Sequence, residues 1–199
     1  MGSRSLSLRA AADDSGVTTP LATTVLNFVL FQVGWFACVL SAAAERPVIG
    51  VLVATGVLAF HLWRASAPRE EMRLILLALA IGAVWESLLV WQDLLRYQAG
   101  VLVPNFAPYW IVMMWGLFAT VPNVSLRWLK GRWLVASVAG LVGGPMAFYA
   151  GQRMGALEFG HEPAALSALA LGWAVLTPLL MALSVRFDGY APAASGGSS

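Results

Sequence analysis

Long runs of apolar residues, separated by short polar segments, dominate the chain between about residues 21 and 186. Each run is close to the roughly 20 residues that a helix needs to cross the hydrocarbon core of a bilayer. The segments lack the alternation of apolar and polar positions over about ten residues that is typical of a membrane β-strand. The pattern therefore predicts an all-α bundle of six transmembrane helices, at about 21–44, 47–63, 72–95, 107–126, 133–151 and 164–185.

The two ends of the chain differ from the rest. Residues 1–20 and 187–199 are rich in Ser, Gly and other small or polar residues and show no helical apolar periodicity. Segments of this kind at chain ends are commonly mobile. We expect two flexible cytoplasmic tails around one transmembrane domain, residues 21–186.

Composition supports a membrane protein. Of the 199 residues, 59% are hydrophobic and 11% charged, whereas a soluble domain has roughly 45–50% apolar and about 25% charged residues. The formal net charge is +2, and the basic residues do not form the dense patch that nucleic-acid binding requires. The expected partner is the lipid bilayer, nucleic acid is not expected, and an oligomer is left open.

Positive charges fall mainly on one side of the predicted helices. Cytoplasmic loops are enriched in Lys and Arg, so the side with more of these residues is expected to face the cytoplasm. The richer side is the one that holds both termini, which predicts a cytoplasmic N-terminus and C-terminus. Its basic residues are Arg4, Arg9, Arg64, Arg69, Arg73, Arg127, Lys130, Arg132 and Arg186, against Arg46, Arg96 and Arg153 opposite.

Glu86 lies inside an apolar helix, with no charged residue between Arg73 and Asp93 except itself. A carboxylate at the bilayer centre costs about 2.5–3.5 kcal/mol on insertion scales, so Glu86 should be protonated, paired or turned toward a cavity in the protein. Two interpretations stay open. Glu86 either carries a proton, acts as an acid or base or binds a ligand, or it is a neutral side chain bonded to a neighbouring helix.

Other polar and aromatic residues are expected at a similar depth, in the outer half of the bilayer. Asp93 follows Glu86 on the same helix face and lies nearer the outer surface. No nucleotide-binding loop or serine-hydrolase motif accompanies them, so catalytic residues are not assigned. The predicted ligand site comprises Gln32, Trp35, Glu86, Asp93, Trp115 and Tyr149.

Neither a metal nor another cofactor is expected. The two histidines, His61 and His161, are predicted on opposite membrane surfaces, and Cys38 is the single cysteine. Residues so far apart do not form the ligand set of one metal ion or haem. A second polar group is instead predicted near the cytoplasmic side: Asn27, His61, Asn123, Ser125 and Arg127.

The fifth helix contains Gly143, Gly144 and Pro145. Such a sequence either interrupts the helix at a binding site or forms a glycine face for close helix packing with a proline kink. The sequence does not separate these two interpretations.

Three segments carry a more specific pattern of polar, aromatic and glycine positions: residues 27–36, 108–129 and 143–156. Together with Glu86, they resemble a family of small bacterial inner-membrane proteins, domain of unknown function 2878, over residues 25–186. The resemblance implies a multi-pass protein of the bacterial cytoplasmic membrane with no assigned activity.

The leading hypothesis is an intramembrane pocket around Glu86 that binds a small or lipid-like ligand. One alternative is a membrane enzyme that acts on lipid with Glu86 as acid or base. Another is a small proton-coupled transporter that uses Glu86 and Asp93.

Overall fold

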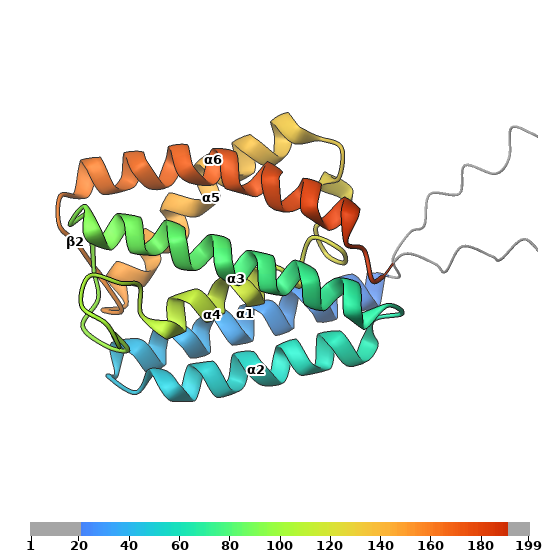
Figure 1. Ribbon diagram of the computed structural model, residues 1–199, viewed down its shortest axis with the longest axis horizontal. Coiled ribbons are helices and arrows are strands. Elements are labelled where there is room, and N and C mark those ends of the chain that lie inside the picture. Colours follow the sequence, from blue (N-terminus) through green and yellow to red (C-terminus); the bar gives the residue numbers. More distant parts are fainter. Residues whose placement is uncertain (1–20, 191–199) are drawn as a thin grey trace, which may run out of the picture.

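The computed structural model describes residues 21–190, and the tails predicted at 1–20 and 191–199 lie outside the described residues. The described chain is mainly helical, with one antiparallel ladder that pairs Leu95 with Phe159 (Figure 1). The helices are α1 (Leu21–Ala43), α2 (Pro47–Arg64), α3 (Pro68–Trp91), α4 (Tyr109–Phe118), α5 (Trp133–Arg153) and α6 (Glu162–Arg186), with the 3-10 turn η1 (Arg127–Leu129) and the strands β1 (Leu95–Arg96) and β2 (Glu158–Phe159).

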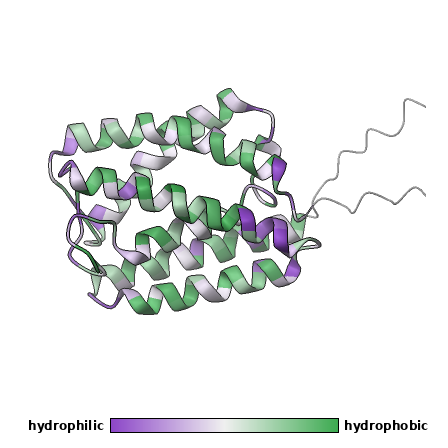
Figure 2. Cartoon of the chain, in the orientation of Figure 1, coloured by the Kyte–Doolittle hydropathy of each residue, from purple (hydrophilic) through white to green (hydrophobic). Residues whose placement is uncertain are grey.

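Five helices, α1, α2, α3, α5 and α6, are long and apolar enough to cross a membrane. Figure 2 shows hydrophobic residues along the helices, with the strongest polar colouring toward their ends. Large apolar side chains such as Leu52, Val84 and Leu171 are exposed on the outside of the bundle. An apolar surface of this extent is stable against lipid rather than water. The protein is thus a multi-pass membrane protein.

The fourth helix is shorter than predicted. The sequence predicts a helix over 107–126, whereas α4 ends at Phe118 and the chain continues as buried turns through residues 119–126. Pro122 contributes to this ending, because a proline disfavours helical geometry in the residue before it and has no N–H to donate. A half-length helix followed by irregular backbone replaces the expected span.

Irregular backbone at membrane depth needs partners within the protein. Asn27 of α1 supplies them: its Nδ2 donates to the Thr120 carbonyl at 3.1 Å. Its Oδ1 accepts hydrogen bonds from the Ser125 hydroxyl at 2.7 Å and the Ser125 N–H at 3.3 Å. One asparagine therefore ties α1 to the turns that follow α4.

The ends of other helices also differ from the prediction. α3 begins at Pro68 and ends at Trp91, about one turn earlier at each end than the predicted 72–95. Proline at the start and acidic residues in the first turn, here Glu70 and Glu71, both favour a helix N-terminus. At the other end of the chain, residues 187–190 are packed against the bundle, although the sequence assigns them to a flexible tail.

The helices fall into two packed groups. α1 packs on α2 and α4, and α3 packs on α4, whereas α5 packs chiefly on α6. Figure 1 shows α5 running obliquely to the other helices. As a result, α1 and α5 face each other across a space whose inner wall is formed by α4.

Candidate functional site

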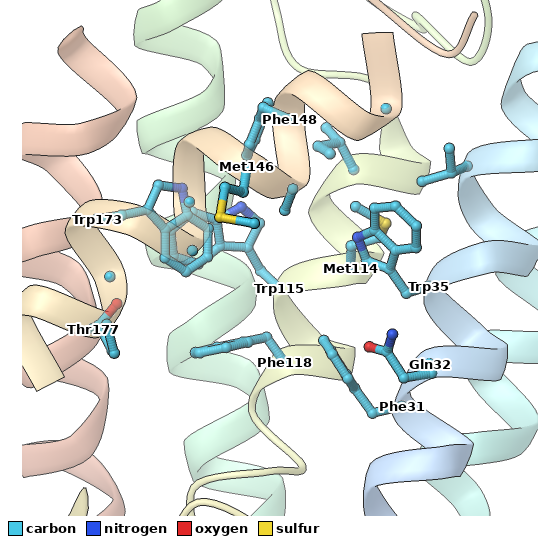
Figure 3. Close-up of a pocket in the computed structure, with 18 of the residues that line it drawn as sticks. Phe31, Gln32, Trp35, Met114, Trp115, Phe118, Met146, Phe148, Trp173 and Thr177 are labelled. Atoms are coloured by element: carbon cyan, nitrogen blue, oxygen red, sulfur yellow. The ribbon is translucent and has the colours of Figure 1, made fainter. Parts of the chain in front are cut away.

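A cavity of about 500 Å³ lies between α1, α4 and α5, with α6 at its far side. Figure 3 shows its aromatic and methionine side chains converging from these separate helices. The wall is overwhelmingly apolar, as is usual for small-molecule sites. Its aromatic lining side chains include Phe31, Trp35, Trp115, Phe118, Phe148 and Trp173.

The α1 side of the cavity holds Gln32 and Trp35, one helical turn apart. In Figure 3 the Gln32 amide and the Trp35 ring extend from α1 toward the side chains of α4. Among the described residues, neither the Gln32 amide nor the Trp35 indole N–H has a hydrogen-bond partner. The α1 wall therefore carries free hydrogen-bonding groups in apolar surroundings.

The opposite wall is a pair of stacked indoles. The Trp115 and Trp173 rings lie 4.8 Å apart between centroids with an interplanar angle of 21°. Phe118 meets the Trp173 ring edge-on, at 5.4 Å and 82°. A Cβ at Gly82 would overlap the Trp115 indole, and one at Gly144 would overlap the Trp173 indole. Glycines on α3 and α5 thus leave room for the two rings to stack.

Glu86 stands behind this wall. It is fully buried, and its Oε1 accepts a hydrogen bond from Trp115 Nε1 at 3.0 Å. Its Oε2 accepts a hydrogen bond from the Tyr97 hydroxyl at 3.1 Å. Glu86 is not among the cavity-lining residues. Its link to the cavity is the Trp115 ring, which the carboxyl group fixes in place.

Two buried polar atoms at the α6 side lack a partner. Trp173 Nε1 and Thr177 Oγ1 have no hydrogen bond to any described residue, and both residues line the cavity. Buried polar groups are normally paired, and an unpaired one costs about 1–3 kcal/mol. Both atoms lie against α5 and not in open cavity space, because a Cβ at Gly140 would overlap Thr177 Oγ1 and one at Gly144 would overlap the Trp173 ring.

Two residues of the predicted site lie elsewhere. Asp93 follows the end of α3 with a φ of 55° and pairs with Arg96, its Oδ1 accepting from Nε at 2.6 Å. Tyr149 is 44% exposed and lines a separate small polar pocket with Arg153. Asp93 was placed wrongly because the predicted helix extends to residue 95, whereas α3 ends at Trp91. Asp93 therefore does not lie on the helix face that carries Glu86.

The glycine-rich part of α5 is not the helix interruption that one of the two interpretations expects. α5 is continuous through Pro145, so the helix is not broken there. Gly140 and Gly144 face α6 at distances that exclude a Cβ, as expected of a packing face. Gly143, in contrast, has open space in front of it and lines the cavity.

A second polar cluster lies at the end of the bundle where residue 190 is found. His61 Nε2 and Glu71 Oε2 are 2.7 Å apart and buried. Glu71 Oε1 accepts hydrogen bonds from Asn123 Nδ2 at 2.6 Å and from the Gly189 N–H at 2.7 Å. The Tyr190 hydroxyl donates to the His61 carbonyl at 2.7 Å. These bonds attach the chain after α6 to α2 and α3.

Charged residues from the turns after α4 complete this cluster. Lys130 Nζ donates to Asp188 Oδ2 at 2.7 Å, and Arg127 Nη2 donates to Asp188 Oδ1 at 2.9 Å. Burial by itself would raise the pKa of Asp188, but these hydrogen bonds outweigh it and hold the pKa below its ordinary value. Burial lowers the pKa of the Lys130 ammonium group. These paired charges hold the chain after α6 against the turns that follow α4.

Sequence reasoning predicted part of this cluster and missed the rest. The sequence predicts His61, Asn123 and Arg127 near this surface, whereas Glu71 falls between the predicted helices 47–63 and 72–95. The available signal was Pro68, which marks a helix start and places Glu71 in the first turn. Asp188 and Tyr190 gave no signal, because their role depends on how the chain folds back.

The fold and the cavity define a class: a multi-pass α-helical membrane protein with an aromatic-lined cavity between its helices. Within that class, the chain belongs to the family described as "Protein of unknown function (DUF2878)", whose model matches residues 24–179. Comparisons with curated proteins and with solved structures gave no significant match.

Proposed function

We propose that this protein binds a small, lipid-like molecule in the cavity between α1 and α5. The observation that carries the proposal is an apolar cavity of about 500 Å³ whose α1 wall holds the Gln32 amide and the Trp35 indole N–H, neither of which is hydrogen-bonded to a described residue. That volume is within the range of about 300–1,000 Å³ that ligand pockets occupy. An apolar ligand with a few polar atoms fits such a wall, because its tail replaces lipid contacts while its polar atoms satisfy the free groups.

The position of the cavity supports entry from the membrane. Its walls include residues of α1 and α5, two helices whose outer faces carry exposed apolar side chains such as Val33 and Val142. Because those faces contact lipid, a molecule dissolved in the bilayer reaches the space between α1 and α5 without crossing water.

The proposed ligand contacts are Gln32, Trp35 and Trp115, which all line the cavity. Glu86 acts as a positioning residue, because it holds the Trp115 indole from behind. This arrangement gives no particular support to the two alternatives from the sequence. An acid–base role for Glu86 requires contact with substrate, and a proton path through Glu86 and Asp93 requires these residues to face one route.

We also propose a location and an orientation: the bacterial cytoplasmic membrane, with both ends of the chain in the cytoplasm. The two ends of the described chain, Leu21 and Tyr190, lie at the same end of the bundle in Figure 1, as this topology requires. Arg127 and Lys130 lie at that end too, through their contacts with Asp188. Their positive charges agree with a cytoplasmic surface.

The test is co-purification. The full chain would be extracted in a mild detergent, and native mass spectrometry would measure the mass of any bound molecule. The blocked variant is Gly143→Phe, since Gly143 borders open cavity space. The control is Gly56→Phe, where the glycine on α2 is exposed and also has open space before it. The proposal expects a bound molecule in the wild type and in Gly56→Phe and its loss in Gly143→Phe; equal loading of all three contradicts it.

A further inference from the structure

The free hydrogen-bonding groups on α1 lie partway along the cavity rather than at one of its ends. The Gln32 amide and the Trp35 indole N–H have no partner among the described residues. Phe31 precedes this pair on α1 and Val39 follows it, and both of these apolar residues line the cavity. Figure 3 shows the nitrogen of the Trp35 ring on the side that faces the cavity. The apolar wall therefore continues in both directions from the pair.

The cavity is long as well as apolar. Its walls include Leu129, in the turn before α5 begins, and Leu157, after α5 ends. The α5 wall between them extends from Ala139 to Gly151, which is about 18 Å of helix at 1.5 Å per residue. A molecule that fills this space must be extended along α5.

The other polar groups of the lining residues are engaged or lie elsewhere. The indole N–H groups of Trp110 and Trp115 donate to residues outside the cavity. Trp173 and Thr177 pack against glycines of α5, with their polar atoms buried there. Trp128 lies at one end of the cavity, before α5 begins, and is 56% exposed. The pair on α1 is thus the polar point in the middle of an apolar cavity.

The chemistry of this pair indicates an oxygen atom as its partner. Gln32 offers two N–H groups beside one oxygen, and the Trp35 N–H donates only. Because the membrane interior supplies no water, an acceptor on the ligand is the partner that remains. Trp115 and Trp173 stack on each other, so this wall leaves no slot for a planar ring. A flexible chain fits instead, since methionines such as Met114 adapt to irregular shapes.

We propose that the ligand is a single long apolar chain with one hydrogen-bonding oxygen near its middle, as in a mid-chain ketone. This inference rests on the proposed function and specifies the ligand class of the same cavity. The oxygen accepts hydrogen bonds from Gln32 and Trp35, and the two arms of the chain extend toward Leu129 and Leu157. A chain with its oxygen at one end would either fill one arm of the cavity or leave the α1 pair without an acceptor.

The experiment compares three probes of equal carbon number: dioctyl ketone, its isomer methyl pentadecyl ketone, and heptadecane, which has no oxygen. Native mass spectrometry titrations of the full chain in lipid nanodiscs give an apparent Kd for each probe. We expect the wild type to bind dioctyl ketone about tenfold more tightly than either other probe, the effect of one hydrogen bond. Because the two ketones have the same composition, the difference between them reports the position of the oxygen.

A variant without the donors tests whether α1 causes the preference. Gln32→Leu combined with Trp35→Phe keeps an apolar side chain and an aromatic ring but removes both donors, and it should bind the three probes about equally. The control is Trp63→Phe, which loses an exposed indole on α2 outside the cavity and should keep the wild-type preference. A preference for dioctyl ketone that persists in a folded double variant overturns the inference.

The wild type alone distinguishes failure of the inference from failure of the proposed function. Equal affinity for the three probes, or tighter binding of methyl pentadecyl ketone, overturns the mid-chain oxygen. If that binding is lost in Gly143→Phe, the proposed function stands. The comparison of the three probes needs no variant to fold. Binding of none of the probes to the wild type overturns the proposed function together with the inference.

Discussion

Glu86 and Trp115 form a buried hydrogen bond of 3.0 Å between a helix carboxyl group and the indole N–H of the cavity wall. The contact joins α3 to α4, the two helices on which the inner wall depends. Because the N–H edge of the Trp115 ring meets Glu86 and a face of the ring stacks on Trp173, Glu86 influences the cavity wall through this one ring.

Replacing Glu86 by alanine should destabilise the protein strongly. The Glu86→Ala variant leaves the Trp115 N–H and the Tyr97 hydroxyl without their acceptor and opens a small void. The expected loss in the free energy of unfolding is about 2–4 kcal/mol. Glu86→Gln keeps an oxygen for Trp115 and should lose less than half as much. Unfolding in detergent micelles measures both, with the exposed Glu158→Gln as control; equal losses in the two Glu86 variants would contradict this role.

Adding one methyl group beside the stacked indoles should disturb the cavity. Gly82→Ala and Gly144→Ala each place a Cβ inside the volume of an indole ring, and overpacking of this kind costs about 1–3 kcal/mol. Gly56→Ala is the matched control, since its Cβ meets no atom. The near-ultraviolet circular dichroism of the tryptophans and the thermal midpoint provide the measurements. If Gly82→Ala has the same circular dichroism and thermal midpoint as Gly56→Ala, the proposed overlap with the Trp115 ring is wrong.

The polar cluster should make the protein sensitive to acid. The folded pKa of Asp188 lies below its ordinary value, so its contribution to stability is fully present above the unfolded value of about 3.9. That contribution is lost as the pH falls through the folded pKa. Thermal midpoints between pH 7 and pH 3 should fall for the wild type, and Asp188→Asn should begin lower and change less. Asp93→Asn, at an exposed ion pair with Arg96, should retain the wild-type pH profile; an unchanged profile in Asp188→Asn would exclude Asp188 as the source.

Cysteine labelling tests the orientation. The native Cys38 is fully buried and should not react with a membrane-impermeant thiol reagent. Ser66→Cys, in the exposed turn between α2 and α3, should be protected in intact cells and react after the membrane is opened. Gln98→Cys, exposed at the opposite end after β1, should react in intact cells. The reverse pattern would invert the proposed topology.

The sequence predicts the helical membrane class well because apolar length is a strong and local signal. The starts of α2 and α6 come within about two residues of the predicted positions. The predicted fourth helix is too long because hydropathy gives no information on hydrogen-bond partners from other helices. Asn27 of α1 supplies such partners to residues 119–126, so this segment does not need to be helical. Hydrogen bonds between residues almost a hundred positions apart give no signal in the local sequence.

In the candidate site too, the sequence predicts the depth of a residue along its helix but not the contacts between helices. Gln32, Trp35 and Trp115 could be placed together by their depth along separate helices, and all three line the cavity. Asp93 and Tyr149 share that depth but not the cavity, because a helix end and a helix rotation decide where they point. Trp173 falls within the predicted helix 164–185, but its stacking on Trp115 depends on helix order in space.

The central claim is that the space between α1 and α5 holds a membrane-borne molecule. The most direct measurement is photolabelling of the full chain in membranes with a lipid whose acyl chain carries a diazirine, followed by peptide mass spectrometry to locate the label. We expect labelling of cavity residues such as Met114 and the buried Phe148, abolished by Gly143→Phe and retained in Gly56→Phe. Labels confined to outward-facing residues such as Phe28 and Leu171, unchanged by Gly143→Phe, would contradict it.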